Sequence, residues 1–402
     1  MVAARPALFA AVIALIGPRG MMASPQPGSI RPGYAGDASC QPCHKERSAS
    51  YERTPHRLTS QLPTASTVHG SFQEDSNLLK IADAEASRPG LEFRMESRND
   101  GLFETARSGW GADAYVRTER IDLVTGSGAR GQTYLYWHGD RLYELPVSFW
   151  SDGRRWINSP GYADGTADFS RPVNPACLEC HASYIRALST DPRTNRYDRG
   201  SLIPGISCES CHGPGAEHVR VETAKRGKSA PGSGILNPAK FSRDRRVDLC
   251  AECHNGIARE ALAPTFSYAP GRPLQEYFKP LPGSDAAHPD VHGNQVGLLE
   301  RSKCYQSSEK MSCSTCHDVH AARKPAEFYS AKCLGCHEWQ QCGDAARMGH
   351  AILGKCIECH MPIEQTNAIV SETGGQVVHA TMRNHWIRVY PEARLPEGSG
   401  KR

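Results

Sequence analysis

Neither sign of charge dominates this 402-residue sequence, because 47 lysines and arginines nearly balance 43 aspartates and glutamates. That balance argues against a nucleic-acid-binding protein, which would need a strongly basic surface. The sequence also has little apolar material between residues 177 and 360, where Pro and Gly separate short segments such as GPGAEH. Such segments cannot bury enough apolar side-chain surface for an ordinary core. Something other than side chains must fill the interior there.

The N-terminal apolar run, residues 7–17, is only eleven residues long and too short to span a bilayer comfortably. Arg5 precedes it, and this pattern is typical of a secretory signal peptide over residues 1–23. Ala23 suits a cleavage site, but Met21 two positions earlier does not, so a retained N-terminal anchor is the alternative. We therefore expect a periplasmic or otherwise exported protein, and peripheral association with a membrane stays open.

Cysteine, by contrast, is abundant and occurs in one repeated pattern. Fourteen of the 16 cysteines belong to seven copies of Cys-x-x-Cys-His, whereas about 0.03 copies are expected by chance. The copies are Cys40/Cys43/His44, Cys177/Cys180/His181, Cys208/Cys211/His212, Cys250/Cys253/His254, Cys313/Cys316/His317, Cys333/Cys336/His337 and Cys356/Cys359/His360.

This pattern is the signature of covalently attached haem. Each thiol adds to one vinyl group of the porphyrin, and the adjacent histidine becomes the proximal iron ligand. A zinc site would pair Cys-x-x-Cys with a second pair or with distant histidines, and a thioredoxin-like motif would occur once. The sequence therefore predicts seven haem c groups, whose porphyrins replace the missing apolar core.

Residues 60–170 contain no haem motif and have the patterns of strands. LEFRME alternates apolar and charged residues, and YLYW and LYEL flank a His-Gly-Asp turn, which predicts a hairpin. The expected fold is a multihaem cytochrome c, made mainly of short α-helices and long loops around haems, with a small β-rich domain inserted. Its expected parts are an N-terminal haem segment (24–59), the β-rich domain (60–170), a six-haem domain (171–390) and a flexible tail (391–402).

A second histidine, His320, follows His317 after three residues. It lies one helical turn away, on the same side of the porphyrin attached at that motif, so any iron that it binds belongs to another haem. His218 follows His212 after a Gly-Pro-Gly turn and supports the same interpretation. Cross-ligation of this kind brings porphyrins close together.

The other distal ligands are less certain from sequence. We expect His56, His292, His350 and His385 to ligate, with His288 or His379 as the source of a seventh ligand. His69 and His138 lie in a polar run and at the expected turn, which favours solvent exposure. An open haem or methionine ligation remains the alternative, with Met311, Met348, Met361 and Met382 as candidates. Cys304 and Cys342 lie outside the motifs and form either a disulfide or two free thiols.

The stretches GISCESCHGPGAEHV and CSTCHDVH resemble the multihaem cytochrome c superfamily that includes pentahaem nitrite reductases and octahaem hydroxylamine oxidoreductases. The resemblance covers roughly residues 172–362 and implies closely packed haem pairs with two histidine ligands on most irons. Those nitrite reductases carry a lysine in one motif, but all seven motifs here end in histidine. The tyrosine cross-link of the hydroxylamine oxidoreductases has no match either. The resemblance therefore implies a non-catalytic heptahaem type.

The sequence favours an electron-transfer protein over an enzyme. Expected partners are other cytochromes, a quinol-oxidising membrane complex or a terminal reductase, and no nucleic acid. The alternative is an oxidoreductase acting on a small nitrogen or sulfur oxyanion at one open haem. The haem potentials, the identity of the partner and the oligomeric state stay open.

Overall fold

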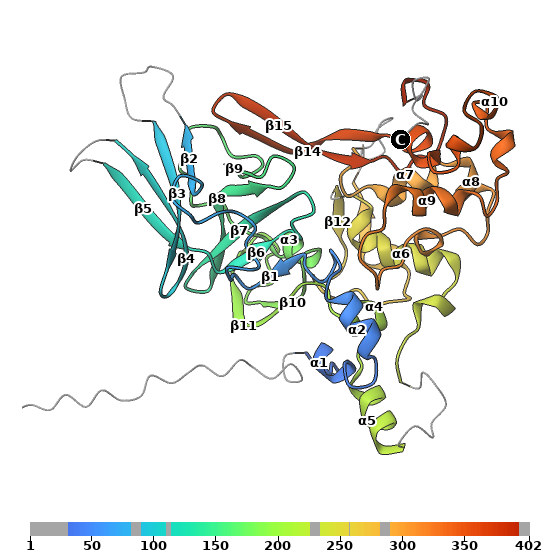
Figure 1. Ribbon diagram of the computed structural model, residues 1–402. Coiled ribbons are helices and arrows are strands. Elements are labelled where there is room, and N and C mark those ends of the chain that lie inside the picture. The colour runs from blue at the N-terminus through green and yellow to red at the C-terminus, as the bar shows by residue number, and fades with distance from the viewer. Residues whose placement is uncertain are drawn as a thin grey trace, which may run out of the picture.

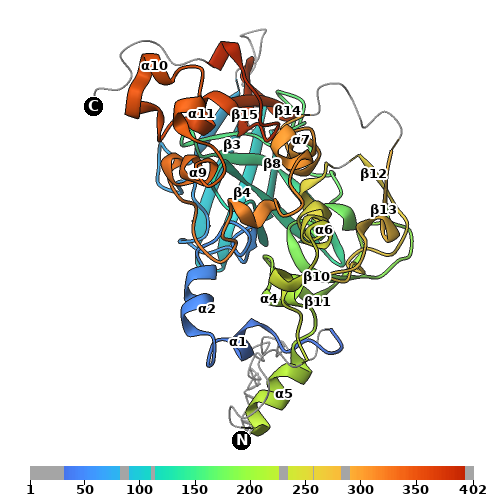
Figure 2. The ribbon, with the colours of Figure 1, turned by 90° about the vertical axis from the view of Figure 1, so that its right-hand side faces the viewer.

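The computed structural model describes residues 31–81, 90–109, 114–225, 234–256, 258–281 and 290–393. The expected signal peptide, His288 and residues 394–402 of the expected tail lie outside these residues. A β-rich part lies beside a part built from short helices and loops (Figure 1). Viewed from the helical side, the sheets lie behind the helices (Figure 2).

The β-rich part consists of two antiparallel sheets that share one hydrophobic core. The alternation of LEFRME gives β3 one buried face, formed by Leu91, Phe93 and Met95. The sheets have the strand orders β1-β6-β7-β8-β9 and β2-β3-β4-β5. Their strands are β1 (Ser60–Gln61), β2 (Leu78–Ile81), β3 (Leu91–Arg98), β4 (Gly101–Ser108), β5 (Tyr115–Arg120), β6 (Leu123–Thr125), β7 (Gly131–His138), β8 (Arg141–Trp150) and β9 (Arg155–Asn158).

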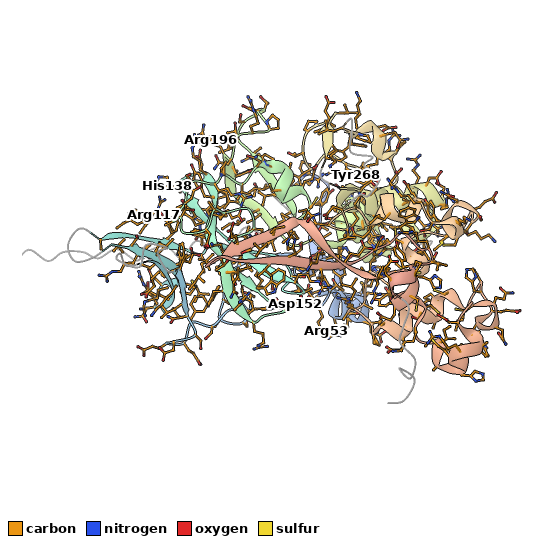
Figure 3. All side chains as sticks on the ribbon, turned by 90° about the horizontal axis from the view of Figure 1, so that it is seen from above. Arg53, Arg117, His138, Asp152, Arg196 and Tyr268 are labelled. Carbon is orange, nitrogen blue, oxygen red and sulfur yellow. The ribbon has the colours of Figure 1, made fainter. Side chains whose placement is uncertain are left out.

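The hairpin predicted around His-Gly-Asp is confirmed. β7 and β8 pair antiparallel, with His138 opposite Arg141 and a two-residue turn between them. Gly139 has a φ of 63°, the left-handed region that this tight turn requires and that glycine adopts without strain. His138 is exposed, as predicted, on the side of the β-rich part away from the helices (Figure 3).

Each haem motif includes a turn of helix. The backbone N–H of His44 donates to the Cys40 carbonyl over 3.0 Å, and His317 donates likewise to Cys313 over 2.9 Å. This bond places the first cysteine and the histidine on one face of the turn. The helices are α1 (Asp37–Cys40), α2 (Lys45–Tyr51), α3 (Pro175–Glu179), α4 (Cys208–His212), α5 (Ala216–Lys225), α6 (Arg243–His254), α7 (Gln295–Glu300), α8 (Lys303–Gln306), α9 (Ala326–Cys333), α10 (Ala345–Met348) and α11 (Cys356–His360).

The expectation of little sheet outside the β-rich domain is wrong. Three further two-stranded sheets occur, and the longest follows the last motif, where Gly374 and Gly375 both have positive φ and form the turn. Gly-Gly between strand-like runs is a hairpin signal that the mainly helical interpretation overlooked. The strands are β10 (Ala182–Ala187), β11 (Tyr197–Pro204), β12 (Arg259–Ala261), β13 (Phe278–Pro280), β14 (Ile363–Thr373) and β15 (Gln376–Arg383).

The β14–β15 hairpin joins the two parts of the molecule, because it extends from the last haem motif to the β-rich part (Figure 1). The backbone N–H of Asn158 in β9 donates a 2.9 Å hydrogen bond to the Thr373 hydroxyl oxygen, and the Asn158 side-chain amide donates to the Glu372 carbonyl. Ala380 packs with Trp150 and Ile157 in a small core. Among the described helices, none has the length and apolarity needed to cross a bilayer.

Glu104 of β4 is fully buried on the face that meets the other sheet. Burial raises the pKa of its carboxyl well above the usual range, and the Val147 backbone N–H offsets only part of that cost. The folded protein therefore keeps Glu104 protonated at pH values where the unfolded chain ionises it. The contribution of Glu104 to stability falls as pH rises above about 4.3, by about 1.4 kcal/mol for each pKa unit of difference.

We expect Glu104→Gln to remove this loss, so that the variant is more stable than wild type at pH 8 and similar at pH 4. Urea unfolding of the haem-loaded protein at several pH values measures it. Glu96→Gln is the control, because hydrogen bonds from Thr105 and Arg98 outweigh partial burial and lower the pKa of Glu96. That variant should instead lose stability at high pH. Parallel pH profiles for wild type and Glu104→Gln would contradict the prediction.

Candidate haem-binding cavity

We number the seven motifs sites 1 to 7 in chain order, so that site 1 ends at His44 and site 7 at His360. All seven sites line one cavity of about 3760 Å³, whose walls come from both parts of the molecule. Shared equally, the cavity offers about 540 Å³ per site, within the range of about 300–1,000 Å³ usual for cofactor pockets. The residues present therefore fit one haem at each motif.

The protein fixes one ring nitrogen of several histidines in the cavity. His212 Nδ1 lies 2.9 Å from the Leu236 carbonyl oxygen, and His360 Nδ1 lies 2.9 Å from the Arg388 carbonyl oxygen. A carbonyl only accepts, so Nδ1 carries the proton and Nε2 is left as the metal-binding nitrogen. The same arrangement holds for His385 with the Arg383 carbonyl (3.0 Å), and Nδ1 has a partner also in His181 (Thr59 Oγ1, 3.0 Å) and His254 (Gln295 Oε1, 3.2 Å).

Four motif histidines each face a second histidine from a distant part of the chain. Two imidazoles in line on one metal ion have ring centres about 6.3 Å apart, from a bond of about 2.0–2.1 Å and about 1.1 Å from nitrogen to ring centre. The observed separations match this value. The pairs are His44/His218 (6.4 Å), His254/His56 (6.1 Å), His212/His320 (6.1 Å) and His317/His385 (6.2 Å).

His320 therefore lies opposite His212 of site 3, and not opposite His317 three residues before it. His317 faces His385. The two ring planes in each of these pairs differ by 33° and 26°, and the planes of His56 and His254 differ by 84°. Rotation about a shared metal–nitrogen axis permits all of these angles.

Burial favours the neutral form of His56 and His385, and neutral imidazole is the form that binds metal. It lowers the pKa of His56 to about 4, with the nearby His254 adding to the effect. It also lowers the pKa of His385 to about 4, against the raising effect of the hydrogen bond to Arg383. The pKa values of His181 and His292 are lowered by burial too, and the two rings are close enough to interact electrostatically.

Three motif histidines have no such partner ring. Within the described ranges, no second imidazole forms a ring pair with His181, His337 or His360, although His181 interacts electrostatically with His292. Of the candidate ligands, His350 is exposed against the Trp339 ring at 4.7 Å, and His379 Nδ1 is held by the Thr366 carbonyl at 3.0 Å. Neither lines the cavity, whereas Met361 and Met382 do. His69 is exposed.

Cys304 and Cys342 both line the cavity and are not joined by a disulfide in this structure. The charge of Cys304 acts on the thiols of Cys316 and Cys333, which places it beside sites 5 and 6. Burial raises the pKa of the Cys304 thiol.

Sequence reasoning missed a group of functional glutamates. Four motifs carry a glutamate between their cysteines, namely Glu179, Glu209, Glu252 and Glu358. Glu209 accepts hydrogen bonds from the backbone N–H groups of Ala35 and Gly36, each over 2.8 Å, and of Gly215 over 2.7 Å.

Two of the other three glutamates also contact distant segments. Glu179 accepts from the Phe266 N–H over 2.8 Å, and Glu358 from Arg383 over 3.1 Å. Burial raises the pKa of the third, Glu252, to about 8, and the negative charges of Glu179 and Cys180 add to the effect. The repeated glutamate inside the motifs was the available signal, and in three of the four motifs it joins the motif to another part of the chain.

Comparison with known proteins agrees with this site. The family model described as "Cytochrome c554 and c-prime" matches residues 161–213, which contain sites 2 and 3. The C-type polyheme cytochrome OmcC of Geobacter sulfurreducens is 27% identical over 173 residues, covering 37% of this chain and 21% of OmcC. The multiheme cytochrome MtrA of Shewanella baltica is 22% identical over 209 residues, covering 50% of this chain and 49% of MtrA.

Among solved structures, that of the Outer Cell Wall Cytochrome OcwA has a similar fold, with a TM-score of 0.55 at 16% identity. The alignment covers 90% of this chain and 81% of OcwA. The chain thus spans between a fifth and a half of the length of these two curated relatives, but most of the length of the structural one.

The motifs, the cavity and these similarities define a multihaem c-type cytochrome. Its relatives OmcC and MtrA are themselves named as polyhaem and multihaem cytochromes. The similarities do not narrow the class to the nitrite reductases or the hydroxylamine oxidoreductases.

Proposed function

We propose that this chain is an exported electron-transfer protein that carries seven haem c groups, most of them with two histidine ligands. The four histidine pairs in one cavity, with ring centres 6.1–6.4 Å apart, are the observation that carries this proposal. Once bound, each haem iron cycles between the ferric and ferrous states and so takes up and releases one electron. Two tightly held imidazole ligands would change their positions little between these two oxidation states.

The distal ligands follow from the pairs. His218 serves site 1, His320 site 3, His56 site 4 and His385 site 5. His292 serves site 2, because it lines the cavity and interacts electrostatically with His181. For sites 6 and 7, His350, His379 and His288 remain the candidates from sequence, with Met361 and Met382 beside them.

Electron exchange with other redox proteins follows from this chemistry. Other cytochromes, a quinol-oxidising membrane complex or a terminal reductase are the partners we propose. An exported location is supported by the N-terminal sequence and by the name of the structural relative, an outer cell wall cytochrome.

A pyridine haemochrome count, combined with the electron paramagnetic resonance spectrum of the oxidised protein, tests the proposal. We expect seven haems per chain and mainly low-spin ferric iron. A colourless exported protein, or a count well below seven, would refute it.

Cross-ligation makes a specific prediction. His320→Ala removes the second ligand of site 3, so one haem iron in seven should become high-spin while site 5, whose histidine is only three residues away, stays low-spin. Resonance spectroscopy at unchanged haem content measures this. His138→Ala is the matched control, because His138 is exposed at the β7–β8 turn, and its spectrum should equal that of wild type. An unchanged spectrum for His320→Ala would show that His320 ligates no iron.

A second candidate function is reduction or oxidation of a small nitrogen or sulfur oxyanion. It is favoured by sites 6 and 7, where the described residues pair no second imidazole with His337 or His360. A high-spin signal in the wild-type protein that nitrite or cyanide removes would support this function. If that signal is absent, electron transfer remains the single proposed function.

A further inference from the structure

The contacts between sites do not follow their order in the sequence. Sites 1 and 3 are joined directly, although site 2 lies between them in the chain. Ala35 and Gly36 donate to Glu209 inside the site 3 motif, and the Cys208 N–H donates to Asp37 over 2.9 Å. His218, just beyond site 3, faces His44 of site 1.

Site 4 follows site 3 in space, since the Cys211 thiol lies within electrostatic range of both Cys250 and Glu252. Sites 4 and 5 are neighbours as well, because α6 packs against the Cys313–Thr315 turn and the Cys250 and Cys313 side chains are close enough to interact. In the loaded protein these sulfurs carry thioether bonds, so a contact between sulfurs of two sites brings two porphyrin edges together.

Sites 5, 6 and 7 continue the series. The ring of Tyr329, in the helix that ends at site 6, lies 5.3 Å from the ring of His317. Sites 6 and 7 are neighbours because α9 packs against α11: the Ile357 N–H donates to Ser330 over 3.3 Å, and the Cys333 and Cys356 side chains are close enough to interact.

Site 2 stands apart from this series. Its described contacts with other motifs run to site 4: Arg259 bridges Glu179 (3.5 Å) and the Glu252 carbonyl, and the Cys180 and Cys253 side chains are close enough to interact.

Outside the motifs, site 2 is also held by Phe266, whose N–H donates to Glu179, by Ser207, whose N–H donates to Ser183, and by the β-rich part. Thr59 Oγ1 lies 3.0 Å from His181 Nδ1, and Ser60 donates to the His181 carbonyl over 2.5 Å. The Arg171–Glu144 ion pair (3.4 Å) lines the cavity beside Cys177.

We propose that electrons pass through sites 1, 3, 4, 5, 6 and 7 in that order, and that site 2 is a side arm attached to site 4. This order rests on the proposed function and specifies the path that the electrons take. The side arm holds one electron against the β-rich part without lying between the two ends of the route. The ends are the N-terminal helices α1 and α2 and the C-terminal helices α9 to α11, which lie on different sides of the molecule (Figure 2).

Timed arrival of a single electron tests the order. A ruthenium bipyridine complex is attached at Ser39→Cys, an exposed position beside site 1, in a background with Cys304→Ser and Cys342→Ser. After a light pulse, ascorbate reduces the excited complex, and the complex then passes one electron to a ferric haem at site 1. Distal substitution by methionine raises the potential and changes the spectrum of one chosen haem, which makes it a visible trap.

The traps are His56→Met at site 4, His292→Met at site 2 and His385→Met at site 5. Sites 2 and 5 each lie one transfer beyond site 4, so their traps should fill about 1.5-fold later than the site 4 trap if each transfer has a similar rate. With traps at both site 2 and site 5, each should receive about half of the electrons. Filling of the site 2 trap before the site 4 trap, or loss of nearly all arrival at site 5 in the double variant, would overturn the order.

Two further outcomes do not decide the order of sites through the trap measurements. If the electron stays at site 1 in a protein with all seven haems attached, the proposed function fails, whatever the order of sites. If a methionine variant loses haem, a structure of the loaded wild-type protein decides instead. The iron nearest to that of site 2 should be the iron of site 4, and a nearer iron from another site would overturn the proposal.

Discussion

Protein produced without haem should lose the structure of its helical part while the β-rich part stays folded. The reason is the cavity of about 3760 Å³, which all seven motifs line. Empty apolar cavity costs about 24 cal/mol per Å³, so even a tenth of the corresponding energy equals the usual net stability of a domain, about 5–15 kcal/mol. The β-rich part, by contrast, has its own core, in which Phe93, Met95 and Leu145 are completely buried.

Limited proteolysis with mass spectrometry measures this result. The chain would be expressed in the cytoplasm without its N-terminal segment, where haem is not attached. We expect rapid cleavage between residues 171 and 393 and a protected fragment close to residues 60–170. The haem-loaded protein is the control and should resist cleavage in both parts. A haem-free protein that resists cleavage throughout would show that the helical part folds without porphyrins.

Glu209→Ala should detach the N-terminal haem segment from site 3. The Glu209 carboxylate is only 2% exposed and accepts three backbone N–H groups, from Ala35, Gly36 and Gly215. Each buried donor left without a partner costs about 1–3 kcal/mol, so for three donors we expect a loss on the order of 3–9 kcal/mol. Because His44 and His218 belong to the two segments that Glu209 joins, site 1 should also lose its second ligand.

Denaturant unfolding and resonance spectroscopy of the haem-loaded variant measure both effects. Glu217→Ala is the matched control, because Glu217 is an exposed glutamate eight residues further on that pairs with Arg220 over 2.5–2.8 Å. Exposed ion pairs contribute about 0–1 kcal/mol, so this variant should behave like wild type. A low-spin site 1 and unchanged stability in Glu209→Ala would show that the segment is held by other contacts.

The patterns that repeat over short distances could be predicted from the sequence. The hairpin at Gly139 and Asp140 was predicted because alternation and turn residues lie within a few positions of one another. The exposure of His69 and His138 was also predicted correctly from their polar surroundings. The β14–β15 hairpin was missed, although Gly374 and Gly375 signal it, because the expectation of helices around haems outweighed a local signal.

For the candidate site, too, the sequence predicted local relations between residues but not those between distant ones. That any iron bound by His320 belongs to another haem followed from helix geometry alone, but which motif histidine it faces did not. His350 illustrates the limit, since its position six residues before Cys356 suggested a ligand and the fold places it against Trp339, outside the cavity. The glutamates inside four motifs were visible, but their partners lie in segments far away in the chain.

By itself, the sequence predicted where haem attaches, because two thiols and a histidine within five residues contain all the geometry that one attachment needs. It also predicted that the interior is filled by something other than side chains. Only the tertiary structure decided which second histidine faces four of the motifs and which sites are neighbours. Those relations join residues far apart in the chain, and their positions depend on how the two parts of the molecule pack, which no local pattern encodes.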